Sequence, residues 1–274
     1  MIIKREDTFS YWVDDIEVSR TFESEIENID KYRCYIEEDQ NLLEKIPENK
    51  DGFLTREFAD FKSFEQIQSA VLQFLIDQFE LDLDTFNLEE NLLGLDDDHF
   101  KEKVQHIYKG IGFDSLPISS LDLEEWASDI VKQKLCLNYF ETKPHLSIRI
   151  VRPDRTDYNP PHRDIYIKRL RNCLNSFMPI YGVNKLSSLS LLKGSHLWNE
   201  SRTERTKLNP IIDGISYNVP ALLRMQNGEK LKLIRPNVND GEIMLFSPYL
   251  VHGGAINLSK KTRISLEFRF KKLY

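Results

Sequence analysis

The stretch Arg263-Ile-Ser-Leu-Glu-Phe-Arg-Phe270 alternates polar and apolar residues with a period of two. That period is typical of a β-strand with one face buried against apolar side chains. Leu146-Ser-Ile-Arg-Ile150 shows the same alternation. Further strand candidates lie between them, at residues 162–167, 174–183, 188–192, 231–234 and 242–246. So many short strands favour a sandwich or a barrel.

The N-terminal half has the helical period instead. Ser63-Phe-Glu-Gln66 resembles a capping box, and the run after it places one apolar stripe on a helix, formed by Phe64, Ile67, Val71, Phe74, Leu75 and Phe79. A second helix is expected at 98–109, ending at Gly110. A third follows Ser120, with an inward face of Leu123, Trp126, Ala127, Ile130 and Val131. Such stripes usually cover a sheet.

The chain of 274 residues is long enough for one domain with a substantial core. We therefore expect a single domain over residues 1–274, with 1–140 as a mainly helical support region and 141–274 as the β core. The fold class is α+β, mainly β with a helical N-terminal half. Asp96-Asp97-Asp98 lacks the glycine and the terminal glutamate of an EF-hand loop, so it is read as a solvated turn or a helix start.

Charge and cysteine content limit the partners and the compartment. A formal net charge of −7 repels a polyphosphate backbone, so nucleic acid is not an expected partner. Cys34, Cys136 and Cys173 lie far apart and have no C-x-x-C spacing, which suits a reducing compartment. The first residues turn acidic where a signal peptide is apolar, and no stretch approaches the roughly 20 apolar residues of a membrane span. We expect a cytoplasmic protein without a membrane partner. The apolar stripes do not specify the oligomeric state.

Two segments carry the residue types of a metal site, namely Pro160-Pro161-His162-Arg163-Asp164 and Ser247-Pro248-Tyr249-Leu250-Val251-His252. On a strand, His162 and Asp164 would share one face while Arg163 points away. A barrel can bring His252, about ninety residues later, beside them. Two imidazoles and a carboxylate form the ligand set of non-haem Fe(II) oxygenases, although the same set also holds Mn, Co, Ni or Zn. A His-x-Asp pair by itself is a weak signal.

Arg263 follows His252 by eleven residues and shares a strand face with Ser265. Inside a barrel, an unpaired guanidinium would be costly, so it requires a carboxylate from the protein or from a ligand. The planar fork of arginine beside a serine hydroxyl suits a dicarboxylate cofactor. The alternative is an ion pair with Glu267 on the outer face.

Taken in order, these motifs resemble the Fe(II)- and 2-oxoglutarate-dependent oxygenases, specifically the phytanoyl-CoA dioxygenase-like branch. The resemblance covers about residues 145–271 and rests on His162-x-Asp164, on Leu191-Leu-Lys-Gly194-Ser195-His196, and on His252 with Asn257, Ser259, Arg263 and Ser265. Lys193 departs from the proline usual in that branch, which affects the shape of the turn. For His196 we expect a turn or packing role, because three protein ligands already complete the facial set.

The resemblance implies a double-stranded β-helix, a jelly-roll or cupin-like barrel, supported by the N-terminal helices. It implies that His162, Asp164 and His252 are catalytic and bind Fe(II). It also implies that 2-oxoglutarate chelates the iron and places its far carboxylate on Arg263 and Ser265, and that O2 takes the remaining position. Hydroxylation of a small-molecule substrate, with release of succinate and CO2, is the expected reaction. Related halogenases lack the carboxylate at the position of Asp164, so halogenation is disfavoured and desaturation is the nearer variant.

The substrate is less constrained. The long polar segment from Trp198 to Arg224 is a candidate lid. Basic residues in and near it form either a rim for an anionic substrate or solvated charges balanced by Glu200 and Glu204; they are Lys168, Arg169, Arg171, Arg202, Arg205, Lys207 and Arg224. Two other classes stay open. A cupin-type metalloenzyme that does not use 2-oxoglutarate would leave Arg263 and Ser265 without a task, and a noncatalytic binding barrel would not need the complete ligand set.

Overall fold

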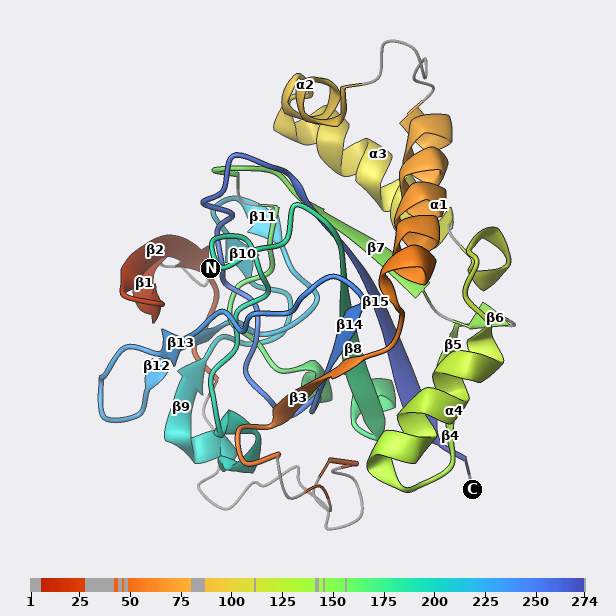
Figure 1. Cartoon of the computed structure of the whole chain (residues 1–274). Coiled ribbons are helices and arrows are strands. Elements are labelled where there is room, and N and C mark those ends of the chain that lie inside the picture. The colour runs from red at the N-terminus through yellow and green to blue at the C-terminus, as the bar shows by residue number, and fades with distance from the viewer. Residues whose placement is uncertain are drawn as a thin grey trace.

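The computed structural model describes residues 6–27, 42–43, 46, 49–79, 87–110, 112–140, 143–144, 146–155 and 157–273. Cys34, His145 and the first five residues lie outside this part. The described chain is mainly β, with helices on one side (Figure 1). None of the helices in these ranges is long and apolar enough to cross a membrane.

The larger sheet has six strands and contains most of those predicted. Its order is β3-β14-β8-β15-β4, and β7 also pairs with β15, all antiparallel. The strands are β3 (Phe53–Glu57), β4 (Leu135–Leu137), β7 (Leu146–Val151), β8 (Cys173–Tyr181), β14 (Glu242–Phe246) and β15 (Arg263–Lys272). The expected strands near 146–150, 174–183, 242–246 and 263–270 are confirmed.

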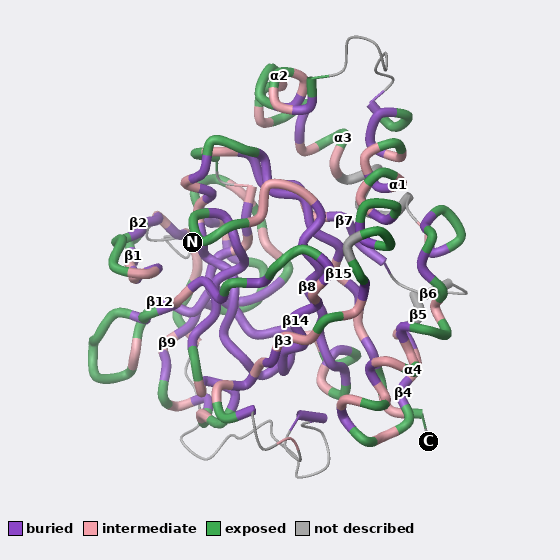
Figure 2. Tube along the Cα trace, in the orientation of Figure 1, coloured by how far each residue is buried: buried purple, intermediate pink, exposed green. Residues whose placement is uncertain are grey.

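The alternation along β15 separates two environments. Ile264, Leu266, Phe268 and Phe270 are at most 1% exposed and belong to the main apolar core (Figure 2). The residues between them project from the opposite face. This is the face that carries Arg263 and the other polar residues of the strand.

Four helices contribute apolar side chains to the core on this side of the sheet (Figure 1). They are α1 (Phe61–Phe79), α2 (Leu88–Leu93), α3 (Asp97–Gly110) and α4 (Ser120–Val131). The predicted stripes of α1 and α4 are buried or partly buried in the core. The capping box at Ser63 was wrong: the Ser63 backbone N–H donates to Asp60 Oδ1 at 2.8 Å, so Asp60 caps α1 and the helix begins at Phe61.

The helical interpretation was also wrong for the N-terminus. Residues 6–23 form a hairpin of β1 (Glu6–Val13) and β2 (Ile16–Glu23). It joins a five-strand sheet of order β11-β10-β2-β1-β13, with β10 (Ile211–Ile212), β11 (Ile215–Ser216) and β13 (Lys232–Leu233). The hairpin lies on the other side of the molecule from the helices (Figure 1). Phe9, Tyr11 and Val13 alternate toward a second apolar cluster, which is the strand period that the helical reading missed.

Three further expectations need correction. The expected strand at 162–167 is instead a single bridge at His162 followed by the 3-10 helices η2 (Asp164–Tyr166) and η3 (Lys168–Leu170), and the one at 188–192 is reduced to bridges at Leu191. The segment 198–224 is not a free polar loop. It contains η5 (Glu200–Arg202), β9 (Thr203–Arg205), β10 and β11, and β9 pairs with β12 (Leu222–Met225). Short elements elsewhere are η1 (Phe113–Ser115), η4 (Ser195–Leu197), β5 (Tyr139–Phe140) and β6 (Lys143–Pro144).

The core between β15 and the helices predicts a large cost for truncation. Leu266→Ala is expected to lower the free energy of unfolding by about 2–5 kcal/mol, because Leu266 is 0% exposed and the cavity would collapse only in part. Leu121→Ala, at a position 66% exposed, is the control and should change it by less than about 0.5 kcal/mol. Urea unfolding of both variants measures this. Equal losses would contradict the assignment of this face of β15 to the core.

Candidate metal centre

The backbone brings the two predicted histidines together. His162 N donates to His252 O and His252 N donates to His162 O, both at 3.0 Å, so the two residues are direct antiparallel partners. Asp164 N donates to Pro248 O at 3.1 Å and fixes the next turn of the same segment. Gly253 has φ +88°, and a Cβ there would lie 2.9 Å from Pro160 O. Only glycine permits this close approach without strain.

The three predicted side chains converge. One ligand atom from each of His162, Asp164 and His252 lies within 4.8 Å of the others. Asp164 Oδ1 is 3.5 Å from Nε2 of His162 and 3.8 Å from Nε2 of His252. All three residues are buried. The three residues predicted from strand periodicity do converge, but by a different backbone route, since Asp164 opens a 3-10 helix rather than continuing a strand.

Both imidazoles are oriented by carbonyl groups. His162 Nδ1 lies 2.8 Å from Pro160 O and His252 Nδ1 lies 2.9 Å from Leu250 O. A proton on Nδ1 satisfies each carbonyl and leaves the Nε2 lone pair facing the centre, as metal-ligating histidines require. Burial, and then the neighbouring His162, lower the pKa of His252 to about 4. The neutral imidazole that binds metal is therefore the stable form at neutral pH.

Asp164 is held by residues that the sequence analysis did not identify. Its Oδ2 accepts hydrogen bonds from Arg269 Nη2 at 2.9 Å and from Asn175 Nδ2 at 3.0 Å, which leaves Oδ1 directed at the histidines. Burial opposes ionisation, but Arg269 and the two histidines hold the pKa of Asp164 well below its usual range. Arg269 lies on β15 six residues after Arg263 and has the same strand parity. That parity was the signal available in the sequence.

Arg263 and Ser265 are buried with unused hydrogen-bonding capacity. Arg263 Nη1 donates to Ser187 O at 3.1 Å, but neither Arg263 Nε nor Ser265 Oγ has a hydrogen-bond partner within the described chain. Burial lowers the pKa of Arg263 to about 10. The outer-face alternative was wrong, because Arg263 is 4% exposed and the carboxylate of Glu267 is 3.2 Å from Arg149 Nε.

The resemblance motifs also have structural tasks. Asn257 and Ser259 shape the turn that leads into β15: Asn257 Nδ2 donates to Val151 O and Lys261 O, and Ser259 Oγ donates to Asn257 Oδ1. Ser195 connects the two ligand segments. Its Oγ accepts from Val251 N at 2.8 Å and its carbonyl accepts from Arg163 Nη2 at 2.8 Å.

His196 is buried and is not among the three converging ligands. It packs against the segment at Gly52, where a Cβ would lie 2.4 Å from His196 Nδ1. Burial, and then the charge of Arg163, lower the pKa of His196 to about 4. The packing role expected from the sequence is consistent with this position.

Two residues of the predicted basic rim, Arg205 and Arg224, lie beside carboxylates of the same segment. Arg224 Nε lies 2.7 Å from Glu204 Oε2 and Arg205 Nε lies 3.4 Å from Glu200 Oε2. Arg163, which points away from the metal centre as predicted, is buried and lies 2.7 Å from Glu200 Oε1. These contacts favour the reading in which Glu200 and Glu204 balance the basic residues.

The donor set fits a divalent transition metal. Two Nε2 atoms and one carboxylate oxygen face a common point from one side, which is the facial arrangement suited to Fe(II). The family profile described as Phytanoyl-CoA dioxygenase (PhyH) matches residues 49–265, which is most of the chain and contains all five predicted site residues.

The chain belongs to the phytanoyl-CoA dioxygenase family. This confirms the resemblance seen in the motifs. No curated protein sequence matches the chain.

Solved structures similar to this chain have low sequence identity. EvdMO1 is 15% identical with a TM-score of 0.49; the match covers 82% of this chain and 48% of EvdMO1, so this chain spans about half the length of that protein. SnoK, described as a non-haem α-ketoglutarate-dependent carbocyclase, is 11% identical with a TM-score of 0.49, covering 87% of this chain and 85% of SnoK. EctD from S. alaskensis, solved with 2-oxoglutarate and 5-hydroxyectoine, is 12% identical with a TM-score of 0.48, covering 99% and 87%. EctD has also been solved with bound Fe.

The contact between Arg269 and Asp164 predicts an effect on metal affinity. Arg269→Met is expected to weaken Fe(II) binding by about 10- to 100-fold, because Oδ2 of a buried ligand loses its charged partner. Lys271→Met, at an exposed position of the same strand, is the matched control and should bind like the wild type. Anaerobic Fe(II) titration against a chromophoric chelator measures both. Wild-type affinity in Arg269→Met would show that Asp164 does not depend on this contact.

The depressed pKa of His196 predicts acid sensitivity of the metal-free protein. Between pH 6.5 and about 4, the unfolded chain binds a proton at this histidine and the folded chain does not. The free energy of unfolding therefore falls as the pH falls, by at most about 1.4 kcal/mol per pH unit for this group. Urea unfolding at pH 7, 6 and 5 should show a flatter decline for His196→Gln than for the wild type.

His99→Gln is the control for this series. His99 is exposed, and its hydrogen bond with Asp96 raises its pKa, so it contributes stability on the acid side. The free energy of unfolding of His99→Gln should therefore fall with decreasing pH at least as steeply as that of the wild type. If the free energy of unfolding of His196→Gln and of the wild type fell in parallel with decreasing pH, the lowered pKa of His196 would be contradicted.

Proposed function

We propose that the protein is an Fe(II)- and 2-oxoglutarate-dependent dioxygenase that hydroxylates a small-molecule substrate with release of succinate and CO2. The observation that carries this proposal is the imbalance between buried arginines and carboxylates around the metal centre. Arg269 pairs with Asp164 and Arg149 pairs with Glu267, which leaves Arg263 with no carboxylate at ion-pair distance within the described chain. A buried guanidinium of this kind requires an anion.

A dicarboxylate meets that requirement. In the proposal, Arg263 and Ser265 bind the far carboxylate of 2-oxoglutarate, which supplies partners for Arg263 Nε and Ser265 Oγ. His162, Asp164 and His252 hold Fe(II) by one face and leave the other positions for ligands. When bound, the iron and 2-oxoglutarate together activate O2 and supply the oxidant. A cupin-type enzyme without 2-oxoglutarate, or a noncatalytic barrel, leaves Arg263 uncompensated.

The protein side chains then have distinct tasks. Pro160 and Leu250 carbonyl groups orient the imidazoles, and Arg269 with Asn175 keeps the second oxygen of Asp164 occupied so that Oδ1 faces the centre. Because Asp164 is present, the position that chloride occupies in related halogenases is filled. This supports hydroxylation, or desaturation, over halogenation. A buried centre suits a small molecule.

The proposed fold is a double-stranded β-helix forming one domain over residues 1–274, with its core in 141–274. Strands β7, β15, β8 and β14 would supply one sheet. The bridges His162–His252, Leu191–His252 and Leu191–Ile234 would supply the opposite sheet. The helices support the first sheet and the β1–β2 hairpin packs at the second.

Anaerobic ligand binding tests the function. The wild type should bind 2-oxoglutarate only when Fe(II) is present, giving the visible charge-transfer absorption of the Fe(II) chelate. Asp164→Ala should lose Fe(II) binding and succinate production. Arg263→Met should keep Fe(II) binding but weaken 2-oxoglutarate binding roughly 100-fold, because a buried charge pair is lost.

Arg224→Met is the control, since Arg224 is exposed and pairs with Glu204. It should bind 2-oxoglutarate like the wild type. Absence of Fe(II)-dependent 2-oxoglutarate binding in the wild type would refute the proposal. Equal affinity in Arg263→Met and the wild type would refute the role of Arg263. A screen of small amino acids, sugars and acyl carriers for stimulated succinate release would then identify the substrate class.

A further inference from the structure

We infer that the α2–α3 segment, residues 87–110, is a positioning clamp for Arg263. The inference rests on the proposed function, in which Arg263 binds 2-oxoglutarate. Arg263 is the antiparallel partner of Val151 on β7. Thr262 precedes Arg263 on the chain, and Arg152 follows Val151. A carboxylate from the helical segment binds each of these two residues.

The first anchor joins α2 to the start of β15. Glu89 accepts hydrogen bonds from the Thr262 backbone N at 2.8 and 2.9 Å and from Thr262 Oγ1 at 2.6 Å. Thr262 is fully buried. Gly182, at φ +63°, packs against the same residue, and a Cβ there would lie 2.1 Å from Thr262 O. Thr262 is thus fixed from two sides, immediately before Arg263.

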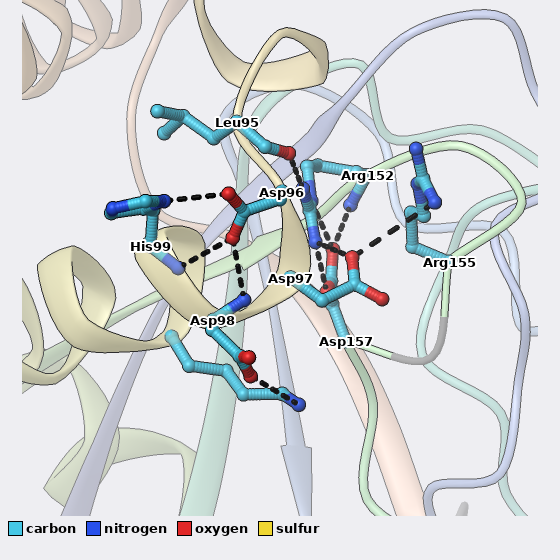
Figure 3. A network of polar contacts seen from close by, with 9 residues as sticks. Leu95, Asp96, Asp97, Asp98, His99, Arg152, Arg155 and Asp157 are labelled. Carbon is cyan, nitrogen blue, oxygen red and sulfur yellow. Dashed lines mark hydrogen bonds and ion pairs between the residues drawn. The ribbon is translucent and has the colours of Figure 1, made fainter.

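The second anchor joins α3 to the end of β7 (Figure 3). Arg152 is fully buried and donates to Asp97 Oδ1, Asp157 Oδ2 and Leu95 O, each at 2.8 Å. Its guanidinium also lies 3.7 Å from the ring centroid of Phe100. Two carboxylates and a ring therefore hold one charge in a single orientation.

The acidic cluster thereby gains distinct roles. Asp96 Oδ1 accepts from the backbone N–H groups of Asp98 and His99 at 3.0 and 2.9 Å, as a helix start requires (Figure 3). This confirms the helix-start interpretation of Asp96-Asp97-Asp98. Asp98 is exposed, whereas Asp97 reaches Arg152. The sequence pattern alone did not distinguish these neighbours.

Arg263 depends on such anchors because its own contacts are few. Within the described residues its guanidinium makes one hydrogen bond, to Ser187 O at 3.1 Å, and lies 5.8 Å from the ring centroid of Phe177. The position of the fork is therefore set mainly by the backbone that carries it. A shift of that backbone by a fraction of an ångström would move the guanidinium N–H donors of Arg263 out of position for hydrogen bonds to a carboxylate.

Paired variants test the clamp. Asp97→Ala and Glu89→Ala should each raise the dissociation constant for 2-oxoglutarate about tenfold in the Fe(II)-loaded protein, while the Fe(II) dissociation constant stays within about twofold of wild type. Asp98→Ala and Glu90→Ala remove neighbouring carboxylates from the same helix turns and should match the wild type. Glu89→Gln keeps one acceptor for Thr262 and should recover most of the affinity. Anaerobic titration of absorption, with Fe(II) affinity measured separately, gives both constants.

The outcomes separate the two proposals. If the wild type, Asp97→Ala and Glu89→Ala all bind 2-oxoglutarate with the same affinity, the clamp is overturned and the proposed function is not. Equal weakening of Fe(II) and 2-oxoglutarate binding also overturns it, since that indicates a general loss of structure. Wild-type protein that binds no 2-oxoglutarate with Fe(II) defeats the proposed function, and the clamp with it. Should Asp97→Ala fail to fold, Asp97→Leu removes both the charge and the acceptor for Arg152 while keeping a side chain of similar size, and unchanged affinity there also overturns the clamp.

Discussion

The reciprocal backbone pairing of His162 and His252 is the constraint on which the centre depends. Directly opposed residues of an antiparallel pair project from the same face, so the pairing alone brings two imidazoles together across ninety residues of sequence. Their ring centroids are 4.3 Å apart, which is close for two groups that would repel if protonated. Burial lowers the pKa of His252 to about 4, and the carbonyl partner of each Nδ1 fixes the orientation of the ring.

Buried charge is the second constraint, and the strands distribute it in pairs. Burial alone would raise the pKa of Glu267, but Arg149, Arg269 and Arg263 hold it below its usual value. The charged residues on the polar face of β15 therefore have different partners: Arg269 pairs with Asp164, Glu267 pairs with Arg149, and Arg263 has no carboxylate at ion-pair distance within the described residues. Removing one member of such a set leaves another uncompensated, so the positions act as a group.

Local sequence patterns predicted four strands of the larger sheet and the three residues that converge, but not the contacts that connect them. The period of β15 and the His-x-Asp pair are readable because each lies within a few residues. The Arg269–Asp164 contact joins residues 105 apart and required the sheet order, which no local pattern specifies. The β1–β2 hairpin was missed although Asp14-Asp15 separates two alternating runs; in the second run the buried Arg20 interrupts the apolar residues of the inward face. That arginine is paired with Asp213 at 2.6 Å, again a contact distant in sequence.

The two strands that pair with the Arg263 end of β15, β7 and β8, contribute unequally to the placement of Arg263. Along β7, six consecutive pairs from Phe268 to Arg263 stay in register, whereas the pairing with β8 shifts between Ile264 and Ser265. Pro179 faces Ser265 at this irregularity, and proline has no N–H to donate to the ladder. A bulge also increases the local twist of the strand. The register of the Arg263 end is therefore set by β7, and whatever fixes the end of β7 fixes the direction of the guanidinium. A one-residue slip there would turn Arg263, Ser265 and Arg269 to the apolar face together.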